Sequence, residues 1–439
     1  MSEQDVTLGE FTDSEEGTSD DWRPVTLGEV SSKRSDNVDP QEISLSRHVG
    51  LEHIHPNTPT PDWEPVDGLS STKRRFKPGD ILFAKLRPNL EKAAQPDFEG
   101  IASTDIFPIV AKEGINSKYL LYRLSSKPAY DHARRTSVGT RMPRTSWNLF
   151  SNFEFDLPPL EEQRKIASVL YTVDQAIQKT EKIESQLQHT KKGLVQDFLT
   201  EGLGDSKVSE TGTKLGQLPD HWDVVTIENI IADEENAFTD GARYSLSSDE
   251  IHSQGEARAI LLEEVGEGEF DDSTPKFATK AKYEEITHRA IYPDEVVVAK
   301  MAEPVARACI VPETYDRYLL GCADVVRIVP DSRIEDRFLM YCMNSHKVWR
   351  QAVAHLRGTG RSRINLENIA ELKIPKPPIE EQTQIVEVLS EFDSKIKTER
   401  RYRERLQRLK QGLMQDLLSG EVRTHDKDIE ILDDVLQHG

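Results

Sequence analysis

Two stretches of this chain, residues 158–199 and 377–418, carry apolar side chains at spacings of three and four with polar side chains between them. This periodicity puts the apolar residues on one face of an α-helix and is typical of a coiled-coil seam. Each stretch opens on two prolines and two glutamates, which suit the free amide groups and the positive end of a helix. The predicted seam residues are Ile166, Val169, Val173, Ile177, Ile183, Leu187, Leu194 and Phe198 in the first stretch and Ile385, Val388, Phe392, Ile396, Tyr402, Leu406, Leu413 and Leu417 in the second.

The two predicted helices are long for a chain of 439 residues. About 42 residues at 1.5 Å each extend roughly 60 Å, which is more than an ordinary module covers. We therefore expect the two apolar seams to pack on each other. The short connections and the positions of the modules favour an antiparallel pair.

The same two stretches are copies of one another. Residues 158–199 align without a gap on residues 377–418 at a constant offset of 219, and 18 of the 42 positions are identical. The register continues upstream, where Gly139-Thr140 and Arg144 match Gly358-Thr359 and Arg363. A duplicated unit of about 200 residues indicates two similar modules that do one job at two places.

Each helix follows a module of mixed pattern. Short β-rich runs at 80–86 and 101–110 precede a helical stretch near 119–134, and the second copy repeats this order with strands at 260–264, 295–300 and 324–329 and helices within 335–355. The predicted fold class is α+β, with two pseudo-symmetric mixed α/β modules separated by two long antiparallel coiled-coil helices. The predicted divisions are an acidic disordered tail at 1–20, modules at 21–156 and 219–375, helices at 157–203 and 376–423, a linker at 204–218 and an acidic tail at 424–439.

The formal net charge of −21 at first argues against a nucleic-acid partner. However, much of the net negative charge comes from the two tails, and residues 132–153 and 337–366 contain arginines or lysines and no acid. A charge run is usually a solvated face, but two islands at equivalent repeat positions favour contacts with phosphates and bases. The candidate DNA-binding residues are Lys85, Arg87, Arg134, Arg135, Arg141, Arg144, Lys300, Arg357, Arg361 and Arg363.

No constellation for catalysis is recognisable. The run Gly358-Thr359-Gly360-Arg361 lacks the lysine and the spacing of a phosphate-binding loop, and no Asn-Pro-Pro-Tyr tetrapeptide of an amino-methyltransferase is present. The three cysteines have no metal-ligand spacing, and histidines such as His53 and His55 are expected at the surface. We predict a chain with no catalytic or metal site and no cofactor of its own. Since no signal peptide or membrane-spanning run is apparent, we expect a cytoplasmic protein with no membrane partner.

Several motifs carry a resemblance to a known family. Leu157-Pro158-Pro159-Leu160-Glu161-Glu162-Gln163 and its copy, the opening Leu218-Pro219-Asp220-His221-Trp222, the run from Gly79 to Pro88 and the run from Leu413 to Arg423 resemble the specificity subunit of type I restriction-modification enzymes. The resemblance covers residues from about 20 to 423. One departure is Asp294-Glu295-Val296 in place of Gly-Asp-Ile, which affects the fine DNA contacts of the second module.

The resemblance implies a non-catalytic subunit that reads a bipartite target in double-stranded DNA, with one recognition domain for each half-site. It implies two methyltransferase subunits and motor-nuclease subunits as partners, which use S-adenosylmethionine, ATP and Mg²⁺ for adenine methylation, translocation and cleavage. Helix residues matched between the copies are the candidate partner-binding residues, namely Glu162, Gln163, Gly193, Glu381, Gln382 and Gly412. The glycines could instead mark a close approach of the two helices. The alternatives for the chain as a whole are a recognition subunit of another DNA-modifying defence complex and a coiled-coil scaffold that never touches DNA.

Overall fold

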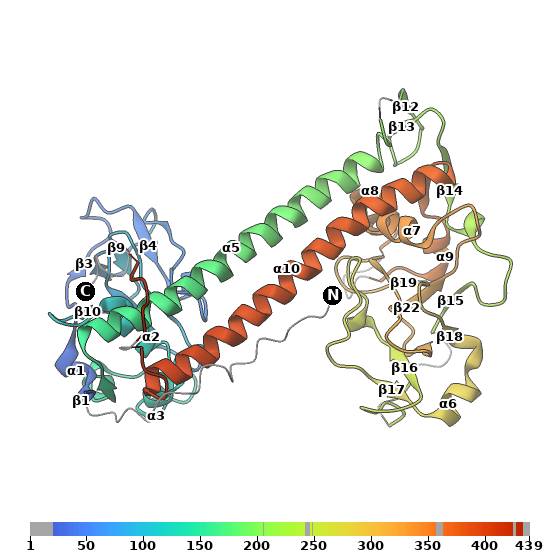
Figure 1. The fold of residues 1–439 in the computed structure, drawn as a ribbon. Coiled ribbons are helices and arrows are strands. Elements are labelled where there is room, and N and C mark those ends of the chain that lie inside the picture. Colours follow the sequence, from blue (N-terminus) through green and yellow to red (C-terminus); the bar gives the residue numbers. More distant parts are fainter. Residues whose placement is uncertain are drawn as a thin grey trace. The chain divides into compact units, whose positions relative to one another are not determined.

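The computed structural model describes residues 21–204, 206–241, 246–247, 249–356, 363–424 and 427–432 (Figure 1). The chain divides into two compact units. Unit 1 contains residues 1–182 and 399–439, and unit 2 contains residues 183–398. Each unit therefore consists of one module together with about half of each long helix.

The two long helices are confirmed as α5 (Leu160–Phe198) and α10 (Ile379–Ser419). Each begins directly after its second proline, because the carbonyl oxygens of Pro159 and Pro378 accept the first helical bonds from the amides of Gln163 and Gln382. The prolines thus precede the first turn. The sequence had suggested that they occupy the first helical positions, and this expectation is wrong. Among the described residues, no helix is both long and apolar enough to cross a membrane.

The two helices run antiparallel within each unit. In unit 1, Val173 and Ile177 of α5 pack on Leu406 of α10. In unit 2, α5 residues from Leu194 onward share a core with Ile385 and other residues at the start of α10. The predicted seam is wrong at Val388 and Tyr402, which are 37% and 51% exposed. Val386 and Leu389 are buried instead, because the start of α10 also packs on the module of unit 2.

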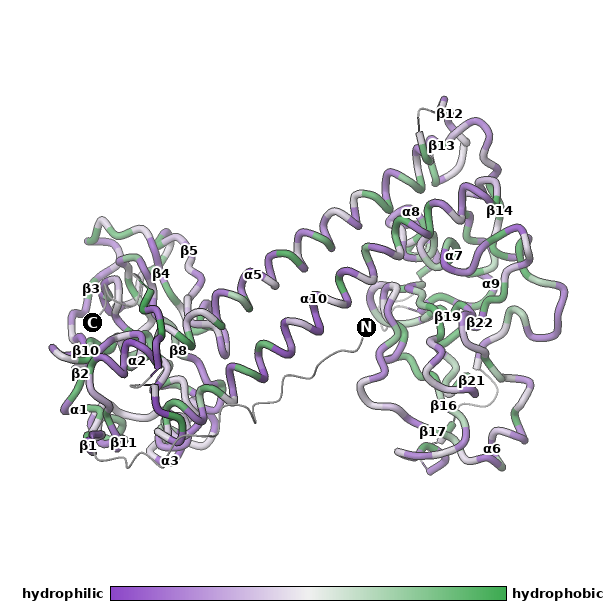
Figure 2. Tube along the Cα trace, viewed as in Figure 1, coloured by the Kyte–Doolittle hydropathy of each residue, from purple (hydrophilic) through white to green (hydrophobic). Residues whose placement is uncertain are grey.

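The module of unit 1 contains three sheets, and antiparallel pairs dominate them. The sheets, each in spatial order, are β1 (Arg23–Thr26) with β11 (Glu154–Leu157); β2 (Ser31–Lys33), β10 (Ile106–Ala111), β7 (Ile81–Ala84) and β8 (Ala93–Ala94); and β3 (Asn37–Val38), β6 (Lys73–Phe76), β9 (Gly100–Ala102), β4 (Arg47–Val49) and β5 (Glu64–Pro65). The α-helices of the module are α1 (Leu27–Val30), α2 (Ser117–Leu124), α3 (Lys127–Arg135) and α4 (Trp147–Phe150). Apolar residues of β7, β10, α2 and α3 form its main core with Ile166 and Leu170 of α5. Along α5 and α10, hydrophobic and hydrophilic positions alternate (Figure 2).

The module of unit 2 repeats this plan. Its sheets, each in spatial order, are β14 (Asp223–Thr226) with β23 (Lys373–Lys376); β15 (Phe238–Asp240), β22 (Val325–Ile328), β19 (Val296–Ala299) and β20 (Ala308–Ile310); and β17 (Phe277–Ala278), β16 (Ala257–Ile260), β21 (Tyr318–Leu320) and β18 (Ala290–Ile291). Its α-helices are α6 (Lys280–Glu285), α7 (Asp336–Met343), α8 (His346–Ala354) and α9 (Leu366–Ala370). The segment predicted as a linker holds a hairpin of β12 (Val208–Glu210) and β13 (Gln217–Pro219).

Most predicted strands and helices of the modules are confirmed, with two corrections. The run at 101–110 is not continuous, because β9 ends at Ala102 and β10 begins at Ile106. The run at 260–264 is not a strand, because β16 ends at Ile260 and a 3₁₀ turn follows over Leu262–Glu264. The carboxylate of Glu264 accepts a bond from the amide of Leu261, at 2.7 Å, and this local bond favours the turn.

One polar triad ties the module to the helices in each unit. In unit 1, the buried carboxylate of Asp174 in α5 accepts bonds from the ammonium of Lys410 in α10, at 2.6 Å, and from the hydroxyl of Tyr122 in α2, at 2.7 Å. In unit 2, Asp393 of α10 is bound in the same way by Lys191 and Tyr341. The three positions are related by the repeat offset of 219, so the duplication has kept the triad as a set.

We predict that the two triads differ in their contribution to stability. Asp174 is 1% exposed, so Lys410→Met should leave an uncompensated buried charge and destabilise the fold by about 3 to 5 kcal/mol. Asp393 is 35% exposed, so Lys191→Met should cost less than about 1 kcal/mol. Urea unfolding of both variants measures the difference. The double variant Lys410→Met/Asp174→Leu should recover most of the loss, and equal costs for the two lysine variants would contradict the argument.

The two modules differ at the start of two equivalent helices, α2 in unit 1 and α7 in unit 2. In unit 1, the side chain of Asn116 accepts a bond from the amide of Tyr119, at 3.0 Å, and caps α2. In unit 2, the equivalent residue Glu335 makes no such cap for α7, and its Oε2 atom is buried without a partner among the described residues. Burial raises the pKa of Glu335 to about 7, helped by the nearby charges of Asp336 and Glu387, although Arg337 opposes the shift.

The exchange Glu335→Asn should therefore stabilise unit 2, and more so at high pH. A carboxyl group whose pKa is raised on folding contributes most below its unfolded pKa of about 4.5, and this contribution is lost as the pH rises through about 7. Asparagine removes that loss and adds a cap worth about 1 kcal/mol. Calorimetric melting at pH 5 and pH 8.5 measures the effect, with Asn116→Glu in unit 1 as the reciprocal variant. A gain in melting temperature that is the same at both pH values would show that the pKa of Glu335 is not raised.

Candidate nucleic-acid interface

The first-turn glutamates of the long helices attach the modules. The buried carboxylate of Glu162 accepts bonds from the indole of Trp22, at 2.9 Å, from the guanidinium of Arg423 and from the amide of Thr424. Burial alone would raise the pKa of Glu162, but these donors together hold it below its ordinary value. Glu381 does the same in unit 2, where it accepts from the indole of Trp222 and the amide of Leu203.

The next residue of each helix fixes a second contact. The buried side chain of Gln163 accepts a bond from the amide of Asn116 and donates one to the carbonyl of Pro158. Gln382 repeats these bonds with the amide of Glu335 and the carbonyl of Pro377. The four predicted partner-binding side chains at positions 162, 163, 381 and 382 are thus engaged inside their own units, and a contact with another protein stays a prediction.

The helix glycines have a different setting. A β-carbon built at Gly193 or Gly412 would meet no described atom within 4 Å, and both residues are exposed. The expectation of a close approach between the two helices at these glycines is therefore wrong. Their role in binding a partner stays a prediction, now on an open surface.

The structure brings together the predicted basic residues that follow β7. The ammonium of Lys85 lies 3.8 Å from the carboxylate of Asp105, and the guanidinium of Arg144 donates to the same carboxylate at 3.0 and 3.2 Å. The amide of Arg87 donates to the carbonyl of Pro143, which joins the loop after β7 to the loop that contains exposed Arg141 and Arg144. Lys85 and Arg144, which are 59 positions apart in the sequence, therefore belong to one basic surface.

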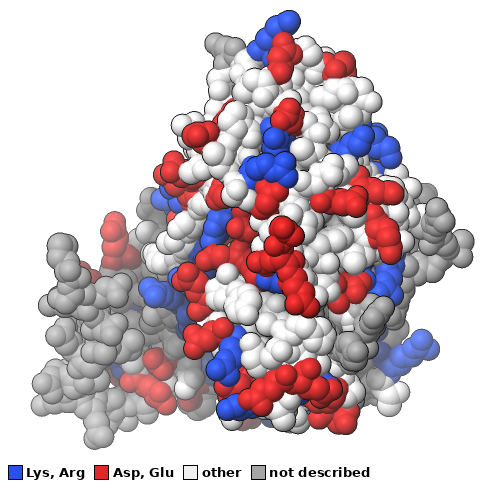
Figure 3. All heavy atoms as spheres, turned by 90° about the vertical axis from the view of Figure 1, so that its right-hand side faces the viewer, with Lys and Arg blue, Asp and Glu red and all other residues white. Residues whose placement is uncertain are grey.

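Unit 2 contains the same arrangement in a more neutral form. The Nε atom of Arg363 lies 2.9 Å from Oδ1 of Asp324 in an ion pair that lacks hydrogen-bond geometry, and the amide of Ile364 donates to the carbonyl of Lys300. Lys300 is buried, and its ammonium is bound by Asp240. On the face of unit 2 drawn in Figure 3, acidic side chains gather with basic side chains scattered among them.

The remaining predicted DNA-binding residues are not part of these clusters or lie outside the structure. Arg134 is paired with Asp131 and Glu91, and Arg135 is exposed on α3. Arg357 and Arg361 lie outside the described residues. Sequence reasoning also missed two cations, Lys33 in β2 and Arg74 in β6, which lower the pKa of Lys85 after the larger effect of its burial. The run Lys73-Arg74-Arg75 was a signal for one of them, whereas nothing in the sequence marks Lys33.

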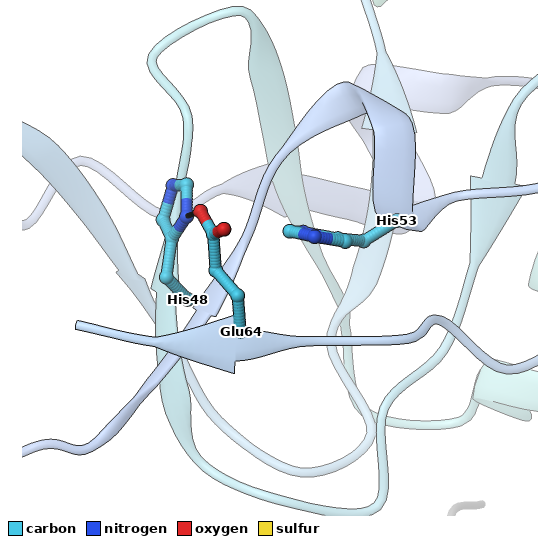
Figure 4. A group of neighbouring side chains, drawn as sticks. All are labelled: His48, His53 and Glu64. Carbon is cyan, nitrogen blue, oxygen red and sulfur yellow. Dashed lines mark hydrogen bonds and ion pairs between the residues drawn. The ribbon is translucent and has the colours of Figure 1, made fainter. Parts of the chain in front are cut away.

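A group of two histidines and a glutamate in unit 1 has atoms that could hold a metal ion. The candidate ligand atoms of His48, His53 and Glu64 all lie within 4.8 Å of one another (Figure 4). However, His48 Nδ1 is bonded to Glu64 at 2.8 Å, and His53 Nδ1 accepts from the amide of Gly50 at 2.9 Å. The latter bond puts the proton of neutral His53 on Nε2, where a metal would need a lone pair. These bonds already account for the arrangement, so we assign no ion to it.

Comparison with known proteins agrees with this architecture. Duplicated α+β modules attached to an antiparallel pair of long helices define the class of fold. The chain belongs to the family of the type I restriction modification DNA specificity domain, whose family model matches residues 19–189 and 268–408.

Individual relatives have low sequence identity to this chain but align with most of its length. The chain is 26% identical over 330 residues to the type I restriction enzyme MjaVIII specificity subunit of Methanocaldococcus jannaschii, with 74% of this chain and 75% of that protein covered. It is also 26% identical over 366 residues to the putative type I restriction enzyme MjaX specificity subunit of the same organism, with 80% of each covered. The solved structure of a type I restriction-modification system S subunit from M. genitalium aligns with a TM-score of 0.54 at 12% identity, over 90% of this chain and 96% of that one, and supports the fold.

We predict that the clusters around Asp105 and Asp324 both contribute to DNA binding. The variants Arg141→Ala/Arg144→Ala in unit 1 and Arg363→Ala in unit 2 should each weaken binding of duplex DNA, and the salt dependence should flatten by about one unit of slope per lost phosphate contact. Filter binding from 50 to 300 mM KCl measures both quantities. If neither the affinity nor the slope changes in either variant, the DNA surface lies elsewhere.

Proposed function

We propose that this chain is the DNA-reading subunit of a type I restriction-modification complex and that each unit binds one half of a bipartite target. The observation that carries the proposal is the duplicated cluster of Lys85, Asp105 and Arg144 in unit 1 and Lys300, Asp324 and Arg363 in unit 2. In each cluster, a carboxylate holds an arginine at the end of a strand, with the rest of the guanidinium partly exposed. A fixed guanidinium is suited to phosphate oxygens and guanine edges.

Membership in the specificity-domain family supports the same function. A specificity subunit supplies recognition and leaves chemistry to its partners, so this chain would have no active site of its own. Methyltransferase subunits would bring S-adenosylmethionine, and motor-nuclease subunits would bring ATP and Mg²⁺. The exposed faces of the long helices, including Gly193 and Gly412, are the surfaces that we propose for partner subunits.

The alternative of a scaffold that never touches DNA has one observation in its favour, the acidic balance of the chain. Against it, a scaffold has no need to collect cations at the same place in both units. Assay of DNA binding by the assembled complex distinguishes the two functions.

We expect that the purified chain alone transfers no methyl groups and that, together with its methyltransferase subunit, it directs adenine methylation to one bipartite sequence. Methylation-sensitive sequencing of DNA treated with the chain, the methyltransferase subunit or both measures this outcome. Exchanging residues 219–375 for the equivalent module of a relative should change one half of the methylated sequence and leave the other half unchanged. Stoichiometric methylation by the chain alone, or methylation without sequence preference by the complex, would contradict the proposal.

A further inference from the structure

A cluster of cations in unit 1 exceeds what the acids around it neutralise. The ammonium groups of Lys33 and Lys85 lie 5.9 and 5.7 Å from the ring centroid of Phe107, which belongs to β10, the strand between β2 and β7. The guanidinium of Arg144 is held near the ammonium of Lys85, because both contact the carboxylate of Asp105. Burial lowers the pKa of both lysines, and the nearby charge of Arg74 lowers it further.

The pairing of these cations is incomplete. Asp105 is the acid that binds Lys85 and Arg144. Among the described residues, neither Lys33 nor Arg74 forms an ion pair, and the Nε atom of Arg74 is buried without a hydrogen-bond partner. Gathering like charges is unfavourable unless an anion joins them, and a phosphate group would supply the missing negative charge.

The equivalent position in unit 2 has a different balance of positive and negative side chains. Lys33 pairs with Ile109 in the register of β2 and β10, and Phe238 pairs with the equivalent residue Ile328 in β15 and β22. An apolar side chain therefore replaces Lys33. Two residues further on, Asp240 adds a carboxylate that binds Lys300, whereas Ser35 follows Lys33 by the same interval in unit 1.

We infer that unit 1 contains a site for backbone phosphate of DNA, formed by Lys33, Arg74 and Lys85, which unit 2 lacks. The half-site bound by unit 1 then supplies the larger share of the salt-dependent affinity. The DNA backbone is the favoured source of phosphate because exposed Arg87 and Arg141 extend the basic surface along the adjoining loops, as a row of phosphates requires. The inference rests on the proposed function.

The test compares salt dependence of binding between matched variants of the full-length chain. The probe is a fluorescent 40-base-pair duplex of random sequence, and anisotropy is measured from 50 to 300 mM KCl. Lys33→Gln and Arg74→Gln should each reduce the slope of log K against log salt by about one unit. Lys127→Gln removes one positive charge from an exposed position on α3 and should change the slope by much less. Thermal melting of each variant checks that it is folded.

A gain-of-function variant makes the test independent of any loss of folding in unit 1. Phe238→Lys/Asp240→Ser introduces into unit 2 the residues found at Lys33 and Ser35, and it should steepen the slope by about one to two units. The inference is overturned if Lys33→Gln and Arg74→Gln behave like Lys127→Gln, or if the unit 2 variant leaves the slope unchanged. If neither the unaltered chain nor its assembled complex binds duplex DNA at any salt concentration, the proposed function fails and this inference fails with it.

Discussion

A carboxylate in the first turn of each long helix is the interaction on which the rest of each unit depends. Glu162 is buried and the side chain of Glu381 is 14% exposed, and both must be supplied with donors, since a charge withdrawn from water without a partner is unfavourable. Each receives an indole N–H from the first strand region of its module and a backbone N–H from the segment that follows one of the long helices. One side chain thus fixes a helix start, a module and a connecting segment at the same point.

The contacts kept by the duplication follow from this constraint. The triads of Asp174 and Asp393, the glutamines at 163 and 382 and the glutamates beside them all join a module to a helix. The groups that differ, such as Asn116 against Glu335 or Lys33 against Phe238, lie on the modules themselves. Attachment is therefore held constant while the module surface is free to change, which is what two readers of different sequences require.

Much of this fold could be predicted from the sequence, because the helices have strong periodicity and the repeat is free of gaps. The exposed Val388 was missed because a seam assigned from spacing alone ignores the module that packs on the start of α10. The contacts of Glu162 could not be predicted, because its partners Trp22 and Arg423 are 140 and 261 positions away in the chain. The composition of the basic clusters was partly predictable, since Arg144 and Arg363 share a repeat position. Lys33 joins its cluster only through the strand order of its sheet, and Arg74 comes from a strand of another sheet.

The acidic balance of the chain and its local basic clusters are compatible features of a DNA reader. A net charge of −21 repels a polyanion over most orientations and so opposes non-specific binding. Attraction is confined to the places where cations outnumber acids, and in unit 1 that place is the surface around Phe107. An encounter is then productive only when the duplex meets this surface. The acidic body thereby favours a defined orientation on DNA at the expense of overall affinity. A subunit that selects one sequence among many depends more on its orientation on the duplex than on the strength of its binding.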